Sequence, residues 1–428
     1  MLSRRALASL LLLALATPGL GCAAAACTKV RDDHRAFTHR RGPADAAQVV
    51  VAVPLATLGQ ALSFPLARLP PISVPMPDLD LPIDLGLGNL EVALRSVQVV
   101  PAPEGQLGLR VRFVLQSRGR DLTAIDLDAT VAPQLAPADG SVRLTVRPQD
   151  LLRVRPSLPP AERQKFAAFI AELLPPAARA LVGGKLDRLA DQALGNFLER
   201  SFPRVRDSLL GNLKTLVDLE IDLPPVPLAR IALRSSAADL ELWLYTTLPA
   251  AGLAAGPARA PGGDPRQIQI RMSGAAAAEL ANQAMTRGQI PARYGLDGEP
   301  SPTGEFTAGV AWQPGPQPLR LHAWKESGTC AHVLFAGTPN ITATRGELSL
   351  AVPDAKVERV TGSVKARIAA WYSGLGKQTF AFTQAVAGAT SFDLLGVDYD
   401  ATPVRAAVVA DDVVIDLQLA PRAAARRP

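Results

Sequence analysis

The sequence predicts an α+β fold in which antiparallel sheet dominates and two tandem halves share a related order of elements. Residues 92–147 alternate apolar and polar side chains at period two, which indicates strands with one buried and one wet face. Residues 158–198 change to the three- and four-residue apolar spacing of amphipathic helices. The third observation is an internal similarity, because the strand-and-helix opening at 49–62 recurs at 268–287.

The first residues have the layout of a bacterial secretory signal. Two arginines precede an apolar run over 6–16, and small residues then lead into Cys22. The run is about half of the ~20 residues that a bilayer-spanning helix needs, so we expect residues 1–21 to be a cleaved signal peptide. A cysteine at this place is typical of a lipobox, whose thiol is acylated as the new N-terminus. Cys27, which follows a run of alanines, is a second candidate for the acylated cysteine. Cleavage of the signal peptide without lipidation stays an alternative.

We therefore predict an exported protein that a lipid holds in the cell envelope, at the outer membrane or its periplasmic face. Residues 22–47 are expected to form a flexible lipidated tether, and residues 421–428 a basic tail. The formal net charge is +6, and the signal peptide contributes two arginines and no acidic residue to it. The remaining excess is concentrated in the tether and tail. It suits an anionic lipid surface but is too weak to indicate a nucleic-acid partner.

Cysteine and histidine positions indicate no reactive site. Cys330 is the only cysteine beyond the signal and tether, so we expect no disulfide within the mature domains and interpret Cys330 as a half-buried strand thiol. His322 and His332 lie near it, but no second cysteine or nearby acid completes a metal or nucleophile site. His34 and His39 are interpreted as solvated side chains of the tether.

The first predicted domain spans residues 48–248 and opens with a β-branched strand. A short helix with proline at its start follows at 54–62. Frequent prolines over 64–87 exclude both a helix and a central strand, leaving an extended edge segment or loop. Alternation then marks four strands, near 92–100, 107–115, 125–131 and 142–146.

Helices and closing strands complete the first domain. A helix starts near Pro160 and carries Phe166 and Ile170 on one stripe. A longer amphipathic helix follows the proline pair at 175–176 and continues to about residue 199. A further stretch at 205–216 keeps helical spacing, and strands are expected at 219–223, 228–233 and 240–245.

Residues 249–265, rich in Ala, Gly and Pro, are predicted to link the halves. The second, β-rich domain spans 266–420 and opens with a strand, after which Ser273 caps a helix. The later apolar stretches are expected to be strands, at 306–312, 319–324, 332–335, 341–352, 361–371, 379–386, 404–409 and 413–419.

This order of elements resembles the tubular lipid-binding superfamily typified by bactericidal/permeability-increasing protein. The resemblance covers 49–245, as strand, immediate helix, meander, helix pair and closing strands, and the second opening at 267–287. It implies a highly curved antiparallel sheet wrapped around a long amphipathic helix, in two tandem domains of related topology, with an apolar tunnel for acyl chains. The second half shows no counterpart of the long helix.

An acyl chain suits a gap between such a sheet and helix, because each buried methylene contributes ~0.8 kcal/mol. The alternative is a dry core, in which case the protein is a structural or scaffolding envelope lipoprotein that binds a protein partner. The residues expected to line the cavity are Leu186, Leu189, Ala193 and Phe197 of the helix and Leu109, Val111 and Phe113 of the sheet.

The sequence contains no motif of a familiar enzyme class. Gly-x-Ser-x-Gly, Ser-x-x-Lys and His-Glu-x-x-His are all absent. Residues 374–379 match a phosphate-binding loop only in part and are interpreted as a turn. We therefore expect no catalytic activity, no cofactor and no metal site.

Overall fold

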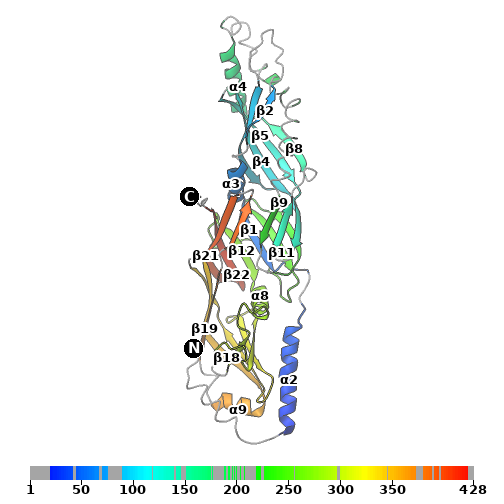
Figure 1. Cartoon of the computed structure of the whole chain (residues 1–428), viewed down its shortest axis with the longest axis vertical. Coiled ribbons are helices and arrows are strands. Elements are labelled where there is room, and N and C mark those ends of the chain that lie inside the picture. Colours follow the sequence, from blue (N-terminus) through cyan, green and yellow to red (C-terminus); the bar gives the residue numbers. More distant parts are fainter. Residues whose placement is uncertain are drawn as a thin grey trace.

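The computed structural model describes residues 20–422, apart from short gaps and most of 177–217. The gaps are 42–44, 67–69, 76–88, 118, 139–140, 146–150, 175, 223–225, 255, 296–298, 345, 373–378, 388–389 and 395–396. The molecule is elongated, with a curled sheet toward each end and a shared sheet between them (Figure 1). It is an α+β protein of antiparallel sheets, which confirms the predicted fold class.

Strands from both halves build the central sheet. Its order is β10-β11-β1-β12-β22-β21-β20, and all neighbours pair antiparallel. β1 (Val49–Pro54) and β12 (Ile268–Ser273) lie side by side at its middle, with Val51 opposite Ile270. The other strands are β10 (Leu228–Ser235), β11 (Asp239–Thr246), β20 (Thr390–Leu394), β21 (Val397–Val409) and β22 (Asp412–Pro421).

The two halves are related by an approximate twofold axis between β1 and β12. Going outward from this pair, each side has a return strand, β11 or β22, and then its hairpin partner, β10 or β21. Each middle strand also leads directly into a helix, α3 (Leu55–Leu66) or α8 (Gly274–Thr286). The predicted similarity of the two openings is therefore confirmed. The structure adds that the halves share one sheet, which the linear division at 249–265 did not anticipate.

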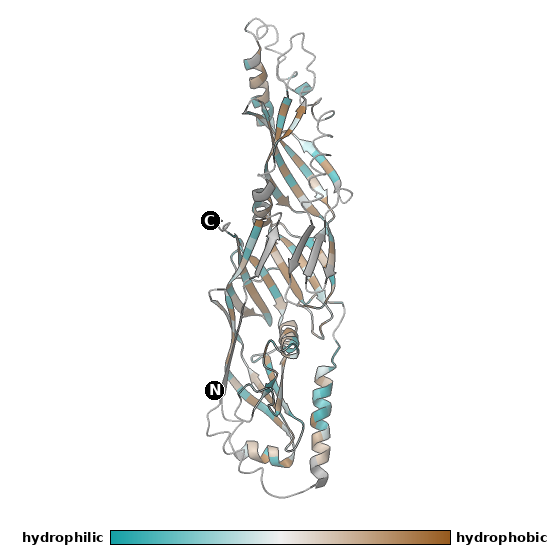
Figure 2. Cartoon of the chain, viewed as in Figure 1, coloured by the Kyte–Doolittle hydropathy of each residue, from teal (hydrophilic) through white to brown (hydrophobic). Residues whose placement is uncertain are grey.

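The sheet of the first half has the order β2-β3-β4-β5-β8, and a three-stranded sheet, β6-β7-β9, lies beside it. Apolar and polar residues alternate along much of β3, β4 and β5 as predicted (Figure 2). On β4 the side chain of Phe113 is buried, whereas Arg110 pairs with Asp128 of β5 at 2.7 Å on the exposed face. The strands are β2 (Ile72–Pro75), β3 (Asn89–Val100), β4 (Leu107–Ser117), β5 (Arg120–Val131), β6 (Gln134–Ala138), β7 (Ser141–Thr145), β8 (Leu151–Ser157) and β9 (Asp218–Asp222).

The sheet of the second half has the order β13-β14-β15-β16-β18-β17, and β19 also pairs with β18. Helix α8 packs on β14, and the backbone N–H of Ala276 donates to the Ser273 hydroxyl at 3.2 Å, as predicted for an N-cap. The strands are β13 (Arg293–Tyr294), β14 (Phe306–Trp312), β15 (Leu319–Lys325), β16 (Ala331–Gly337), β17 (Asn340–Thr344), β18 (Glu347–Gly362) and β19 (Thr379–Ala387).

One helix lies where it was predicted, and another lies where a strand was predicted. α4 (Pro160–Leu173) begins where predicted, with Pro160 in its first turn. α9 (Val364–Tyr372) replaces most of the strand expected at 361–371. That prediction was wrong because Ser363 caps a helix there, accepting from the backbone N–H of Ala366 at 3.3 Å.

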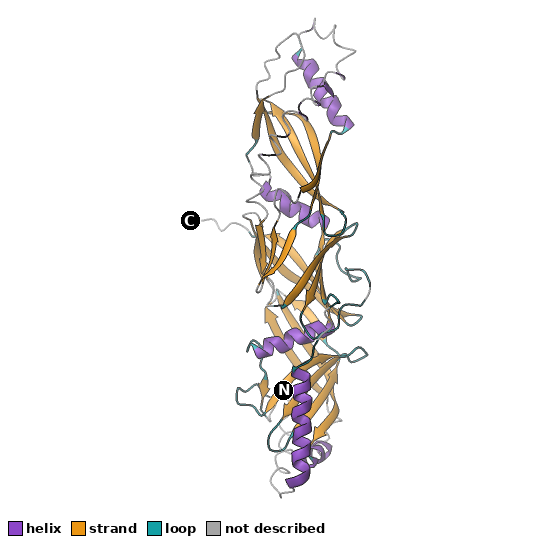
Figure 3. Cartoon of the chain, turned by 90° about the vertical axis from the view of Figure 1, so that its right-hand side faces the viewer, coloured by secondary structure: helices purple, strands orange, loops and turns teal. Residues whose placement is uncertain are grey.

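The N-terminal segment is folded rather than a flexible tether. It forms α2 (Leu20–Thr38), which packs against β15, β16 and β18 of the second half (Figure 3). Cys27, Val30, His34 and Phe37 share one face of α2, and Cys27 forms a disulfide with Cys330 whose Cα atoms are 5.2 Å apart. The expectations of a flexible 22–47 segment and of no disulfide were therefore wrong. Among the described residues, no helix combines the length and the apolar character needed to cross a membrane.

Candidate functional site

The residues predicted to line a cavity fall into two neighbouring apolar clusters. Phe113 and Phe197 are 3% and 2% exposed and belong to one buried cluster, against which Val111 packs. Leu109, although it shares a strand with Phe113, belongs to a second cluster beneath α3. Three predicted helix residues, Leu186, Leu189 and Ala193, lie outside the described residues.

Helix α4 closes the first cluster. Phe166 and Ile170 of this helix are 2% and 0% exposed, and Leu115 and Ile125 of the sheet are 1% and 2% exposed. Side chains with so little accessible surface leave no water-sized space beside them, as in an ordinary close-packed interior. The described part of this cluster is therefore a packed core.

Glu162 holds α4 on the sheet. Its carboxylate accepts hydrogen bonds from the backbone N–H of Ala124 at 3.0 Å, from Arg112 at 3.1 Å and from Lys165 at 2.8 Å. In return the Thr123 hydroxyl donates to the backbone carbonyl of Glu162 at 3.0 Å. Burial raises the pKa of Glu162, but the hydrogen bonds from Lys165 and Ala124 lower it more, so the pKa lies below its usual value. This buried charge fixes the position of the helix.

The second cluster, which we call the leucine interior, lies where the first sheet meets the central sheet beneath α3. Its buried members come from α3, β3, β10 and β11, and further apolar side chains that keep accessible surface pack against them. The buried members are Leu55, Val99, Leu233 and Leu240, and the partly buried ones are Val53, Leu58, Leu62, Leu107, Leu109, Leu135 and Leu242. Partly accessible apolar side chains outnumber buried ones here, and apolar surface gains free energy when an apolar ligand covers it.

Ser63 and Gly59 position α3 over the leucine interior. The Ser63 hydroxyl accepts from the backbone N–H of Val97 at 2.8 Å, and its proton is shared between the carbonyls of Val97 at 2.9 Å and Gly59 at 2.7 Å. It does so beside the register shift between Leu94 and Ser96, where β3 leaves its regular pairing with β4. A Cβ atom at Gly59 would lie 3.1 Å from the Val97 carbonyl oxygen, so glycine permits this close approach.

A second group, which the sequence analysis did not assemble, lies between α2 and the second half. Trp324, 1% exposed, stacks on His34, His322 and His332, with ring centroids 4.6, 5.0 and 5.1 Å away. Phe37 tilts against the same indole at 4.8 Å. We call these five residues the aromatic stack. The spacing of Cys27, Val30, His34 and Phe37 on α2 was the available sequence signal for it.

Two histidines of the aromatic stack are held neutral. His322 Nδ1 and His332 Nε2 are 3.0 Å apart, so one ring N–H donates to the bare nitrogen of the other ring. Burial, followed by the charge of His332 and nearby arginines, lowers the pKa of His322 to about 3. Burial also lowers the pKa of His332 to about 4, against the opposing effect of Asp33. No three His, Cys, Asp or Glu side chains converge as metal ligands in the described part of the chain. The rings of His34 and Phe37 on α2 pack against Trp324 of β15, so the stack joins α2 to the sheet.

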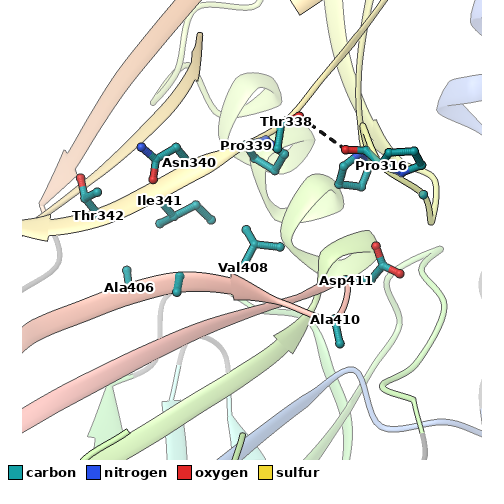
Figure 4. Close-up of a pocket in the computed structure, with 13 residues that line it drawn as sticks. Pro316, Thr338, Pro339, Asn340, Ile341, Thr342, Ala406, Val408, Ala410 and Asp411 are labelled. Atoms are coloured by element: carbon teal, nitrogen blue, oxygen red, sulfur yellow. Dashed lines mark hydrogen bonds between the residues drawn. The ribbon is translucent and has the colours of Figure 1, made fainter. Parts of the chain in front are cut away.

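A groove of about 580 Å³ lies between β17 and β21, away from both clusters (Figure 4). Ile341 and Val408 face each other across it, and Thr338 and Asp411 lie toward one end. Asp411 is the one charged residue in its described lining, which otherwise consists of Ile341, Val408, a glycine, prolines, alanines and small polar residues. This lining mixes apolar and small polar side chains, unlike the leucine interior.

Comparisons with known proteins give weak structural likenesses. No protein-family description and no curated sequence matches the chain. A crystal structure of a lipopolysaccharide binding protein aligns over 88% of this chain and 99% of its own, with 13% identity and a TM-score of 0.27. The P47 protein of Clostridium botulinum E1 aligns over 87% of this chain and 99% of its own, with 6% identity and a TM-score of 0.39. Both TM-scores lie below 0.5, so neither likeness assigns a function to this chain.

Proposed function

We propose that this protein is an envelope lipoprotein, anchored through an acylated Cys22, that holds an acyl lipid in the leucine interior. The observation that carries the proposal is the accessible apolar surface that Leu58, Leu62, Leu109 and Leu242 present beneath α3. The role would be transfer, sensing or maintenance of envelope lipid. The ligand is stated as a class, an acyl chain with a polar head.

The chemistry of the leucine interior supports an alkyl ligand. All eleven of its described members are Leu or Val, and such branched aliphatic side chains suit a hydrocarbon ligand. Each methylene transferred from water contributes ~0.8 kcal/mol, so an acyl chain of ordinary length gains enough to offset its lost motion. A charged head would remain outside this surface, because burial without a partner is costly.

The anchor is proposed at Cys22 rather than Cys27 for a structural reason. The sulfur of Cys27 is bonded to Cys330, and a sulfur in a disulfide has no thiol for acylation. Cys22 precedes Cys27 by five residues on the same helix. Lipidation at Cys22 and the disulfide at Cys27 are therefore compatible in one molecule, whereas lipidation at Cys27 is not compatible with that disulfide.

Native mass spectrometry of an unacylated Cys22→Ser protein, isolated without detergent from a bacterial envelope, tests the ligand. We expect discrete added masses that organic solvent removes and that fragment as acyl lipid. Leu109→Trp on β4 and Leu242→Trp on β11 fill the interior and should each abolish the added mass. Arg110→Trp is the matched control, because it places the same side chain on the exposed face of β4 and should retain the ligand.

The rival function is a scaffold with a dry core, and the packed first cluster is the observation that favours it. On that reading the protein gives a bare mass even after incubation with envelope lipids, and it co-purifies with a protein partner. Circular dichroism of the tryptophan variants separates loss of ligand from loss of fold. A bare mass for the folded parent protein would overturn the lipid-binding proposal.

A further inference from the structure

Helix α9 has an inverted arrangement of its side chains. Its small residues Ala366, Ala369 and Ala370 are 7%, 6% and 9% exposed and face β18, whereas its large apolar residues face outward. The outward stripe consists of Val364, Ile368 and Trp371, which are 51%, 41% and 77% exposed. An ordinary surface helix of a soluble protein does the opposite and buries its large apolar residues.

Cations flank this outward stripe. At 3.6 residues per turn, Val364, Ile368 and Trp371 lie within one narrow strip of the helix surface. Lys365 and Arg367 are exposed and project to the two sides of that strip. No residue of α9 is acidic. An apolar strip with a tryptophan, bordered by basic residues, is the composition of a helix that lies in the interface of an anionic bilayer.

The position of α9 in the fold also supports a lipid bilayer as its partner. The backbone N–H of Ser363, the cap of α9, donates to the carbonyl of Cys330 at 2.9 Å, and Cys330 is bonded to Cys27 of α2. Cys22 lies five residues before Cys27, or about 7.5 Å along the helix axis at the usual rise. The beginning of α2 and the whole of α9 are accordingly at the same end of the elongated molecule (Figures 1 and 3).

We propose that α9 is a membrane-contact helix, which lays Val364, Ile368 and Trp371 into the interface of an anionic lipid bilayer while Lys365 and Arg367 meet its head groups. With the anchor of the proposed function at Cys22, the two contacts would hold this end of the molecule against the membrane and direct the leucine interior away from it. Binding through α9 requires neither acylation nor a ligand in the leucine interior.

The test uses the chain from residue 22 onward with Cys22→Ser, so that neither a covalent lipid nor the apolar run of the signal peptide contributes. Its binding is measured by co-sedimentation with vesicles of phosphatidylglycerol mixed with phosphatidylcholine, and with vesicles of phosphatidylcholine alone. We expect binding to the anionic vesicles, with a blue shift of tryptophan emission. Trp371→Ser should weaken it about tenfold, as expected for removing roughly 60 Å² of buried apolar surface. Replacing both Lys365 and Arg367 with Gln should remove the preference for anionic vesicles.

Val404→Ser is the matched control, because Val404 is 39% exposed but lies on β21. It should bind vesicles like the parent, and the thermal midpoint should show that each variant is folded. Equal binding by parent and Trp371→Ser would overturn the proposal, as would no binding to either vesicle. Self-association that Trp371→Ser abolishes, without vesicle binding, would assign the face to a second copy instead. Bound acyl lipid, measured on the same samples, should be unchanged in Trp371→Ser, which separates this proposal from the proposed function.

Discussion

Cys27 on α2 and Cys330, just before β16, form a disulfide across a sequence separation of 303 residues. The bond places the N-terminal helix beside the buried indole of Trp324 and makes it part of the folded second half. A segment that composition alone assigns to a mobile tether is thereby fixed against a sheet.

Replacing Cys330 with Ser should lower the free energy of unfolding by about 2–4 kcal/mol, because the cross-link restricts the unfolded chain. Guanidinium unfolding with and without reductant measures this. Reductant should destabilise the parent protein by a similar amount and leave Cys330→Ser unchanged. Cys22→Ser is the control and should unfold like the parent, since Cys22 takes no part in the bond; an equal loss in that variant would contradict the pairing.

Acidification should destabilise the protein through the aromatic stack. The pKa values of His322 and His332 are lowered from 6.5 to about 3 and about 4 in the folded state. The unfolded state therefore binds more protons below pH 6.5, and the free energy of unfolding falls as the pH drops from 6.5 toward those values. The slope is at most about 1.4 kcal/mol per pH unit for each histidine.

Unfolding at a series of pH values from 7 to 5 measures that slope, before most carboxylates titrate. His322→Gln should flatten the dependence, because one of the two coupled groups is gone. The charged and titratable groups that act on this pair are Arg40, Arg320, Arg359, Asp33 and His34. His39→Gln should leave the slope as in the parent, since His39 is exposed and outside the stack. Identical slopes for the two variants would show that the pair is not the cause.

Ser63→Ala should destabilise the protein by about 1–2 kcal/mol, because it leaves the half-buried N–H of Val97 without its hydrogen-bond acceptor. The loss should also loosen α3 and lower the retention of ligand in the leucine interior. Gln60→Ala, on the exposed side of the same helix, is the control and should change stability by less than about 0.5 kcal/mol. Chemical unfolding and native mass spectrometry of both variants give the two readouts.

Asp416→Ala should destabilise the central sheet by about 3–5 kcal/mol. The Asp416 side chain is 1% exposed; it accepts from Gln269 of β12 at 2.8 Å and pairs with Arg405 of β21 at 3.1 Å. Removing it leaves both partners without their acceptor. Asp400→Ala breaks an exposed pair with Arg422 in the same sheet and should cost less than about 1 kcal/mol. Thermal unfolding compares the two, and equal losses would mean that burial of Asp416 is unimportant.

Local pattern was enough to predict most strands. Apolar and charged residues alternate over 109–113 of β4 and 125–129 of β5, and the Arg110–Asp128 pair lies on the predicted wet face. The start of α4 at Pro160 was equally plain, since proline at the first helical position favours one conformation. These features depend on residues that are close together in the sequence, so the sequence alone is enough to predict them.

The secondary structure of short segments, and the apolar cluster to which a buried residue belongs, could not be predicted from local pattern. Residues 361–371 contain β-branched residues and alanines in nearly equal measure, so their composition favours neither a strand nor a helix. The cap at Ser363 and the packing of the alanines on β18 stabilise the helix α9. Leu109 and Phe113 point to the same face of β4, yet they belong to different clusters because α3 and α4 cover different parts of that strand. Sequence spacing gives the face of a strand but not which helix lies over it.

The sequence by itself determined the α+β class, the antiparallel strands and the similarity of the openings at 49–62 and 268–287, because these follow from the periodicity of apolar residues along the chain. Tertiary structure alone decided that β1 and β12 share one sheet, that Cys27 meets Cys330, and that α9 turns Trp371 outward. Each of these depends on contacts between residues far apart in the chain or on which surface a short helix has available to cover. Local periodicity carries no information about either.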